Sequence, residues 1–248
     1  MARVAAVVAD VRRGPAWQIR EVQVASRLAA AGAPVVPPAT EAPPGPHIRR
    51  HRVVSFMAHV EVAAGPPDPV AAARALRACH VALARDRLDL PPHALLQEAR
   101  GLIPRLVAEG VLAADEAEVV ERAAGRAATA LGARGLALRP VHGDAHLGNA
   151  LPTAGGVLWS DWEDAFLGPV EWDLACLVHP GRVLGEDVEA CETALAAYEG
   201  PVDAAALEAA LVGRTVQGAV WAALFARAKP GRSEMVTAHV AWLREWAV

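Results

Sequence analysis

The sequence predicts an α+β protein with a small mixed α/β lobe, residues 1–63, and a larger, mainly helical lobe, residues 64–248. Two observations predict this division. Strand-like apolar segments surround a single helical stripe in the first part, whereas most of the second part repeats its apolar residues at helical spacing. Between the two lies the run AGPPDP, residues 64–69, whose proline and glycine content is typical of a domain boundary.

The small lobe is expected to contain one helix and three strands. Apolar and β-branched residues from Val4 to Val11 predict the first strand. A helix is expected from Pro15 to about Ala31, with Gly32 ending it. After a proline-rich connector, the alternation from His47 to Val62 predicts two further strands.

The large lobe is expected to consist of helices interrupted by one hairpin. Helical spacing predicts helices over about 70–84, 93–109, 115–131, 186–198, 203–228 and 233–246. Pro104 is expected to break or kink the second of them, because proline cannot donate a helical hydrogen bond. Asp115, Asp203 and Ser233 are expected to be N-caps, because their side chains accept hydrogen bonds from the first turn.

Polar side chains gather between residues 142 and 173, with apolar runs on either side. Burying such a cluster is costly unless its members pair or bind a ligand or a metal, so it is the candidate site. Residues 150–160 within it predict a strand, a turn and a strand, and a hairpin would return Asp161 to the side of Asn149. The polar members are His142, Asp144, His146, Asn149, Asp161, Glu163, Asp164, Glu171 and Asp173.

The groups expected to converge there suit phosphoryl transfer. Asp144 can accept the proton of an attacking hydroxyl, while Asn149 and Asp161 supply the hard oxygen ligands that Mg²⁺ prefers. The spacing H-x-D-x-x-x-x-N, which runs from His142 to Asn149, is also that of a kinase catalytic loop.

These motifs resemble those of the aminoglycoside phosphotransferase and choline-kinase-like family. The likeness rests on HGDAHLGN, SDWED and EWDLA, and it extends to residues 19–38, 53–60 and 75–80. It implies a protein-kinase-like bilobal fold, ATP or GTP as the phosphoryl donor, Mg²⁺ as cofactor, and a small molecule with a hydroxyl group as the acceptor.

The resemblance also implies a role for each matching residue. Asp144 takes the place of the catalytic aspartate, and Asn149 and Asp161 take those of the Mg²⁺ ligands. Asp173 matches a buried aspartate that supports the catalytic loop, here through His142. Glu21 falls where a helix glutamate pairs with a strand lysine that holds the nucleotide phosphates.

The first lobe departs from the family pattern. No glycine precedes Gly14, and the only lysine is Lys229, near the C-terminus. We therefore expect a shortened first lobe without a glycine-rich loop, and Arg3 or Arg12 are the candidates for the cation beside Glu21.

Two alternatives remain open. A catalytically impaired pseudokinase or ligand-binding relative would keep the fold and lose turnover. A metal-dependent hydrolase would instead use His142, Asp144 and His146 as metal ligands.

Several acidic residues also have two interpretations. Glu163 and Asp164 either lie behind the metal site or form a solvated turn, and the solvated turn is favoured for Asp164. Residues 186–192 form either an acidic wall for an amino-containing substrate or a solvated helix start.

Composition limits the remaining classes. The net charge of −4, without a basic stripe, argues against a nucleic-acid partner and is compatible with a cationic substrate. No apolar run approaches the roughly 18 residues of a membrane span. The apolar patch before Asp10 is too short for a signal sequence. Cys79, Cys176 and Cys191 show no paired spacing, which favours reduced cysteines and a cytoplasmic location.

Overall fold

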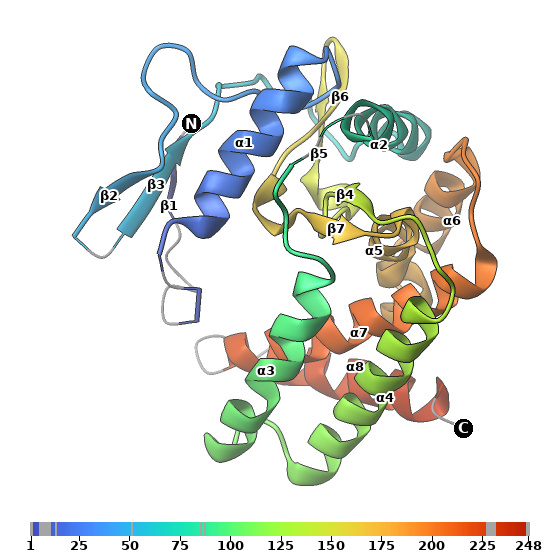
Figure 1. The fold of residues 1–248 in the computed structure, drawn as a ribbon. Coiled ribbons are helices and arrows are strands. Elements are labelled where there is room, and N and C mark those ends of the chain that lie inside the picture. The colour runs from blue at the N-terminus through green and yellow to red at the C-terminus, as the bar shows by residue number, and fades with distance from the viewer. Residues whose placement is uncertain are drawn as a thin grey trace. The chain divides into compact units, whose positions relative to one another are not determined.

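The computed structural model describes residues 2–4, 11–12, 14–50, 52–84, 86, 88–226 and 232–246. Contacts between residues divide the chain into two compact units. The first comprises residues 1–90, 139–167 and 193–200, and the second comprises residues 91–138, 168–192 and 201–248. Strands β1 to β6 and helices α1 and α2 belong to the first unit, and the second is built mainly of helices (Figure 1).

A three-stranded antiparallel sheet lies near the start of the first unit. Its strands are β1 (Ala2–Val4), β3 (Arg52–Phe56) and β2 (His47–Arg49), in the order β1-β3-β2. The three predicted strands are confirmed, but the predicted ranges are too long. Val11 lies in a turn, residues 5–10 lie outside the described residues, and Met57 makes only an isolated bridge to Pro38. Backbone hydrogen bonds flank this bridge, from the Ala39 amide to the Phe56 carbonyl at 3.0 Å and from the Ala58 amide to the Pro37 carbonyl at 2.8 Å.

Helix α1 (Ala16–Ala30) ends where the sequence predicts. Gly32 adopts a left-handed conformation with φ of 69°, which costs glycine little. The Ala33 amide donates to the Leu28 carbonyl at 2.9 Å, and the Gly32 amide donates to the Ala29 carbonyl at 3.0 Å. These two bonds form a Schellman motif, which satisfies carbonyl groups that the helix end would otherwise leave open.

The predicted hairpin is confirmed and is held on both sides. Strands β5 (Ala150–Thr153) and β6 (Gly156–Trp159) pair in antiparallel register, with Ala150 opposite Trp159. The Trp159 indole donates to the Ala72 carbonyl of α2 (Pro69–Leu83) at 3.0 Å, and the Trp159 carbonyl accepts from the Val36 amide at 2.9 Å. Asp161 therefore follows a strand end that is fixed by both α2 and the connector after α1.

Two further short elements complete this region. Strand β4 (Arg139–Val141) leads into the polar cluster and pairs with β7 (Phe166–Gly168), which leads out of it. Two single-turn 3₁₀ helices, η1 (Leu147–Asn149) and η2 (Trp162–Asp164), lie between these strands in the sequence.

Helix α7 (Ala204–Ala226) is the centre of the second unit. It contacts α3 (Ala94–Ala108), α4 (Ala114–Gly132), α5 (Val170–Leu184) and α8 (Arg232–Trp246). Helix α6 (Val188–Ala197) begins in this unit and ends among residues of the first. The Asp203 carboxylate accepts from the Ala205 and Ala206 amides at 3.0 Å, so the predicted N-cap of α7 is confirmed.

The predicted helix ranges do not include α5, although an acidic residue such as Glu171 in its first turn is of the kind expected at a helix N-terminus. Its residues from Glu171 to His179 are all buried, so the segment lacks the polar face that gives a helix its sequence period. Pro180 inside the helix adds a second signal against it.

Two predicted N-caps in this unit are wrong, and the predicted break at Pro104 does not occur. Helix α3 continues through Pro104, whose exposed position lets water bond the carbonyl that loses its helical donor. Helix α4 begins after Ala113, whose amide donates to the Glu116 carboxylate at 3.0 Å, so Asp115 is not its cap. Helix α8 already includes Arg232, one residue before the expected cap Ser233.

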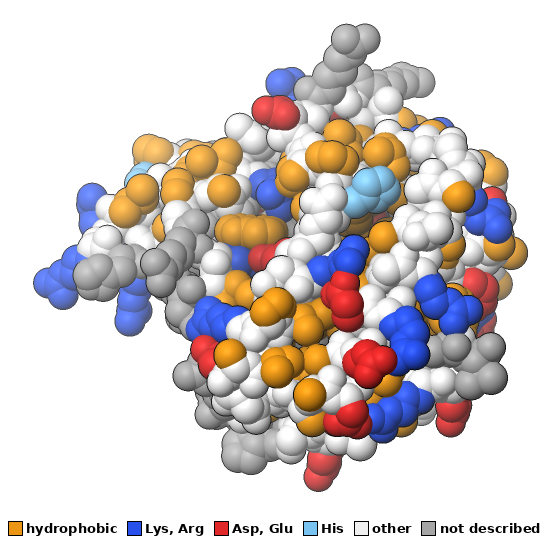
Figure 2. All heavy atoms as spheres, turned by 60° about the horizontal axis from the view of Figure 1, so that its bottom comes forward, with side chains coloured by type: hydrophobic (Ala, Val, Ile, Leu, Met, Phe, Trp, Pro, Cys, Tyr) orange, Lys and Arg blue, Asp and Glu red, His pale blue; other side chains and the backbone are white. Residues whose placement is uncertain are grey.

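Charge on one face of the molecule is mixed in sign, as Figure 2 shows. Within the second unit, Arg244 pairs with Asp115 at 2.7 Å and Arg134 pairs with Asp203 at 2.9 Å. By length and composition, α7 is the one helix of the described chain that could cross a membrane, which the sequence analysis did not expect. It is mostly buried among its helical neighbours, as is typical of a core helix.

His239 is a buried histidine in this helical core. Its side chain is 1% exposed, its Nδ1 lies 2.5 Å from the Met235 carbonyl, and its ring stacks on His179 with centroids 5.1 Å apart. Burial, with a smaller contribution from the charge of Arg214, lowers the pKa of His239 to about 4.

This burial predicts a loss of stability on acidification. Above pH 6.5 the ring is neutral in both the folded and unfolded states, but below it the unfolded chain binds a proton that the folded chain rejects. Between pH 6.5 and about 4, the free energy of unfolding is expected to fall by about 3 kcal/mol from this residue alone. Urea titrations across this range should show a smaller fall for His239→Gln and an unchanged fall for His59→Gln, which alters an exposed histidine. An equal fall in His239→Gln and the unaltered chain would contradict the assignment.

Candidate functional site

His142 anchors the loop that follows β4. Its side chain is fully buried, with its ring centroid 4.5 Å from that of Trp162 and 5.4 Å from that of Trp159. Its Nε2 lies 2.8 Å from the Ser160 carbonyl, and its Nδ1 accepts from the Asp144 amide at 3.3 Å. One tautomer, with the proton on Nε2, satisfies both bonds, so the ring links the loop to the end of the hairpin.

Asp144 lies where this loop turns. Gly143 before it has φ of 88°, a conformation that favours glycine. The Asp144 carbonyl accepts from the His146 amide and from the Asn149 side chain, both at 2.9 Å, which closes the loop on itself. The Asp144 carboxylate is half-buried, and its Oδ2 lies 3.5 Å from His146 Nε2.

Asn149 joins this loop to the hairpin. Because its side-chain nitrogen donates to the Asp144 carbonyl, its oxygen is the atom left to bind a ligand. The backbone carbonyl of Asn149 accepts from both the amide and the hydroxyl of Ser160 at 3.0 Å. Asn149 thus lies beside the residue that precedes Asp161, as the hairpin pattern predicts.

Asp161 has an uncommon backbone conformation. With φ of 68° and ψ of 53° it is left-handed, which aspartate tolerates better than most residues but which still costs energy. It directly precedes η2, and it is one of four described non-glycine residues with positive φ. Such conformations often occur at functional sites, where the surrounding structure enforces them.

Glu21 lies on α1 and is 1% exposed. Its carboxylate accepts from the Ser55 hydroxyl of β3 at 2.8 Å. The sequence analysis overlooked Ser55, although its place between apolar neighbours on an inward-facing strand position marks a polar group that must find a partner. The pairing of Glu21 with Arg3 or Arg12 remains a prediction. Arg12 pairs with Asp164, and the side chain of Arg3 lies outside the described residues.

Asp164 is not solvated as the sequence analysis favoured. Its side chain is only 14% exposed, and its Oδ1 lies 2.7 Å from Nη1 of Arg12. Glu163 lies farther from the same nitrogen, at 3.8 Å, and is 25% exposed. The turn after Asp161 is therefore held by a cation from before α1.

Asp173 and Glu171 lie in the first turn of α5, in the second unit. Asp173 is fully buried. The Glu171 carboxylate accepts from the Asp203 amide at 3.0 Å, which joins the starts of α5 and α7. The support of His142 by Asp173 remains a prediction.

The acidic segment at residues 186–192 is partly neutralised. Arg182 donates to both oxygens of Glu192, at 2.7 and 3.0 Å, and this pairing lowers the pKa of the Glu192 carboxyl. Glu192 is therefore paired, and it does not add an uncompensated charge to an acidic wall for a substrate.

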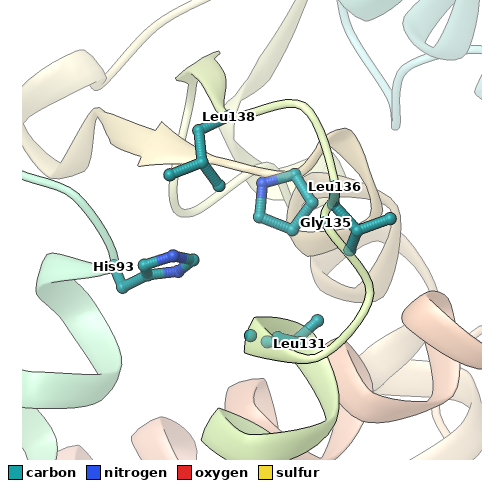
Figure 3. Close-up of a pocket in the computed structure, with 7 residues that line it drawn as sticks. His93, Leu131, Gly135, Leu136 and Leu138 are labelled. Atoms are coloured by element: carbon teal, nitrogen blue, oxygen red, sulfur yellow. The ribbon is translucent and has the colours of Figure 1, made fainter.

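A small pocket of about 130 Å³ lies within the second unit. Figure 3 shows the His93 ring reaching from the start of α3 toward the loop that carries Leu136 and Leu138. His93 is another left-handed residue, with φ of 50°. Apart from His93, the pocket is lined by apolar residues and glycines. It therefore lacks the carboxylates that phosphoryl transfer requires.

Metal binding by histidines finds no support in the described residues, among which no group of three or more His, Cys, Asp or Glu side chains is arranged to hold a metal ion. Both ring nitrogens of His142 are already bonded within the protein. These bonds disfavour the hydrolase alternative, which needs His142 as a ligand.

Comparison with known proteins agrees with this geometry. Residues 5–228 match the model of a family described as the phosphotransferase enzyme family. The chain belongs to this family. No curated protein shows significant sequence similarity to this family member.

Solved structures of similar fold include kinases for small molecules. An amicoumacin kinase in complex with AMP-PNP, Ca²⁺ and Ami has 15% identity and a TM-score of 0.71, covering 98% of this chain and 80% of that one. The choline kinase LicA from Streptococcus pneumoniae has 16% identity and a TM-score of 0.69, covering 97% and 85%. A spectinomycin phosphotransferase in complex with ADP and spectinomycin has 14% identity and a TM-score of 0.63, covering 91% and 81%. The predicted protein-kinase-like fold is confirmed.

Proposed function

We propose that this phosphotransferase moves the γ-phosphate of ATP or GTP to a hydroxyl group of a small molecule. The proposal rests on the hydrogen bonds that join Asp144 to Asn149 and Asn149 to Ser160. These bonds bring together the residue that carries the Asp144 carboxylate, the residue that carries the Asn149 amide oxygen, and the residue that precedes Asp161. Family membership supports the reaction class, and the residue roles rest on this geometry.

The residues fit a magnesium ion. Asn149 is oriented so that its oxygen, not its nitrogen, is available, and Asp161 supplies a carboxylate from a constrained backbone. Oxygen donors of this kind suit Mg²⁺, so Asn149 and Asp161 would hold the ion, which when bound would offset the charge of the nucleotide phosphates.

Asp144 is assigned the role of the base. Its carboxylate is half-buried, and its backbone is held by His142 and by Asn149. It would orient the acceptor hydroxyl and take its proton during transfer, a role that needs position more than an altered pKa. We assign His142 and Asp173 to structural support of this loop, and Glu21 to the nucleotide side of the site.

The acceptor is inferred from chemistry and from relatives of similar fold. Those relatives include a choline kinase and a spectinomycin phosphotransferase. With a net charge of −4, the chain is compatible with an acceptor that carries both a hydroxyl and an amino group. All three cysteines are buried and none forms a disulfide, which supports the proposal that the protein works in the reducing cytoplasm. The two lobes, residues 1–63 and 64–248, remain part of the proposal.

Nucleotide binding tests the proposal against the pseudokinase alternative. Calorimetric titration with ATP and with GTP should show binding that tightens by about tenfold or more when Mg²⁺ is added, because the ion would offset the charge of the phosphates beside the carboxylates. Binding that ignores Mg²⁺ would favour the ligand-binding relative. No binding of either nucleotide at millimolar concentration would overturn the proposed reaction.

A further inference from the structure

Arg12 is a buried arginine before the start of α1, held by two contacts. Its side chain is only 6% exposed. Its Nη1 lies 2.7 Å from Oδ1 of Asp164, and its guanidinium lies 3.7 Å from the centroid of the Trp17 ring. Stacking on an indole while pairing with a carboxylate uses the planar shape of arginine, which lysine does not share.

A second arginine acts on the same turn. Arg20 donates to the Glu163 carbonyl at 3.2 Å, and its guanidinium lies 4.5 Å from the Trp17 ring centroid. Helix α1 also packs along η2. The turn Trp162–Asp164 is therefore held at two points. Arg12 pairs with the Asp164 side chain, and Arg20 donates to the Glu163 carbonyl.

The turn depends on these contacts for its stability. It has three residues, and the amide of Ala165 bonds the Trp162 carbonyl at a long 3.2 Å. A 3₁₀ turn of this length has little stability of its own. Asp161, immediately before it, is left-handed, so the surrounding contacts must maintain that conformation.

We propose that Arg12 is a positioning residue that, through Asp164, holds Asp161 in the orientation in which it binds a divalent metal. The inference rests on the proposed function, because it assigns Asp161 as a ligand. Outer contacts of this kind orient metal ligands in many proteins, and their loss commonly weakens metal binding by about 10- to 100-fold.

Simple electrostatics predicts the opposite result. Removing Arg12 takes one positive charge away from Glu163 and Asp164, which by itself would make the surroundings of Asp161 more attractive to a cation. Removing the charge of Asp164 would, by the same reasoning, weaken the attraction. Only the positioning role predicts weaker metal binding for both Arg12→Gln and Asp164→Asn.

A double-mutant cycle separates these effects. Mn²⁺ affinity, measured by electron paramagnetic resonance with AMP-PNP present, is expected to fall about tenfold for Arg12→Gln, for Asp164→Asn and for the double variant alike. A roughly hundredfold fall in the double variant would mean that the two residues act independently and would overturn the inference. Unchanged or tighter binding by Arg12→Gln would also overturn it.

Hydrogen exchange tests, without any ligand, whether the Arg12–Asp164 pair stabilises the turn. In the metal-free protein, the Ala165 amide is expected to exchange faster in Arg12→Gln and in Asp164→Asn, while amides of α7 keep their rates. Arg100→Gln, which removes a surface pair with Glu121 in the second unit, is the matched control and should change neither measurement. An unchanged Ala165 rate in both variants would overturn the inference even if their Mn²⁺ binding is weakened. Absence of Mn²⁺ binding by the unaltered protein would instead overturn the proposed function.

Discussion

Replacing Asp144 with asparagine is expected to lower kcat for phosphoryl transfer by about 10³-fold, because the amide cannot accept the proton of the attacking hydroxyl. The variant keeps the size of the side chain and the backbone bonds to His142, His146 and Asn149, so the fold should survive. Steady-state kinetics with an accepted hydroxyl substrate, together with a thermal melt, measures both. Nucleotide affinity should change little, since the assigned role is toward the acceptor.

His146→Gln provides the matched control for this prediction. The His146 ring lies 3.5 Å from the same carboxylate and bonds the Gly148 amide at 3.1 Å, yet it has no assigned part in the transfer. We expect turnover within a few-fold of the unaltered enzyme. Retained turnover in Asp144→Asn would remove the base assignment, and loss of turnover together with metal content in His146→Gln would revive the hydrolase alternative.

Removing the carboxylate of Asp161 is expected to cost about 10² to 10³ in kcat/KM and to raise the Mg²⁺ concentration for half-maximal activity strongly. Two substitutions separate the ligand from the backbone. Asp161→Asn keeps a residue that tolerates the left-handed conformation, and Asp161→Gly removes the strain of φ at 68° altogether. Titration of activity with Mg²⁺ is the measurement.

Thermal stability distinguishes the two roles of this residue. Asp161→Gly should melt at a temperature close to that of the unaltered chain, because relief of strain offsets the added freedom of the unfolded glycine. Activity should nonetheless be lost in both variants. Full Mg²⁺-dependent activity in Asp161→Gly would show that the carboxylate is not a metal ligand.

The local framework of the site could be predicted from spacing because it is made of short-range bonds. Asn149 bonds the carbonyl of Asp144 five residues earlier, and the hairpin register follows from a strand, a short turn and a strand. Such contacts depend on chain geometry over a few residues. The same holds for the end of α1 at Gly32, where backbone conformation alone decides.

Helices without an exposed face could not be predicted in this way. In α5 almost every side chain is buried, so the sequence carries no alternation between apolar and polar positions. Pro104 within α3 shows the converse, because its local signal for a break is overruled where the lost bond faces water.

The sequence by itself determined the family motifs, the proposed catalytic loop from His142 to Asn149 and the return of the hairpin to Asp161. Only the tertiary structure decided that Ser55 bonds Glu21 and that Arg12 pairs with Asp164. The reason is physical. A carboxylate removed from water must find a partner, but which distant donor reaches it depends on how α1, β3 and η2 pack, and no spacing in the sequence records that choice.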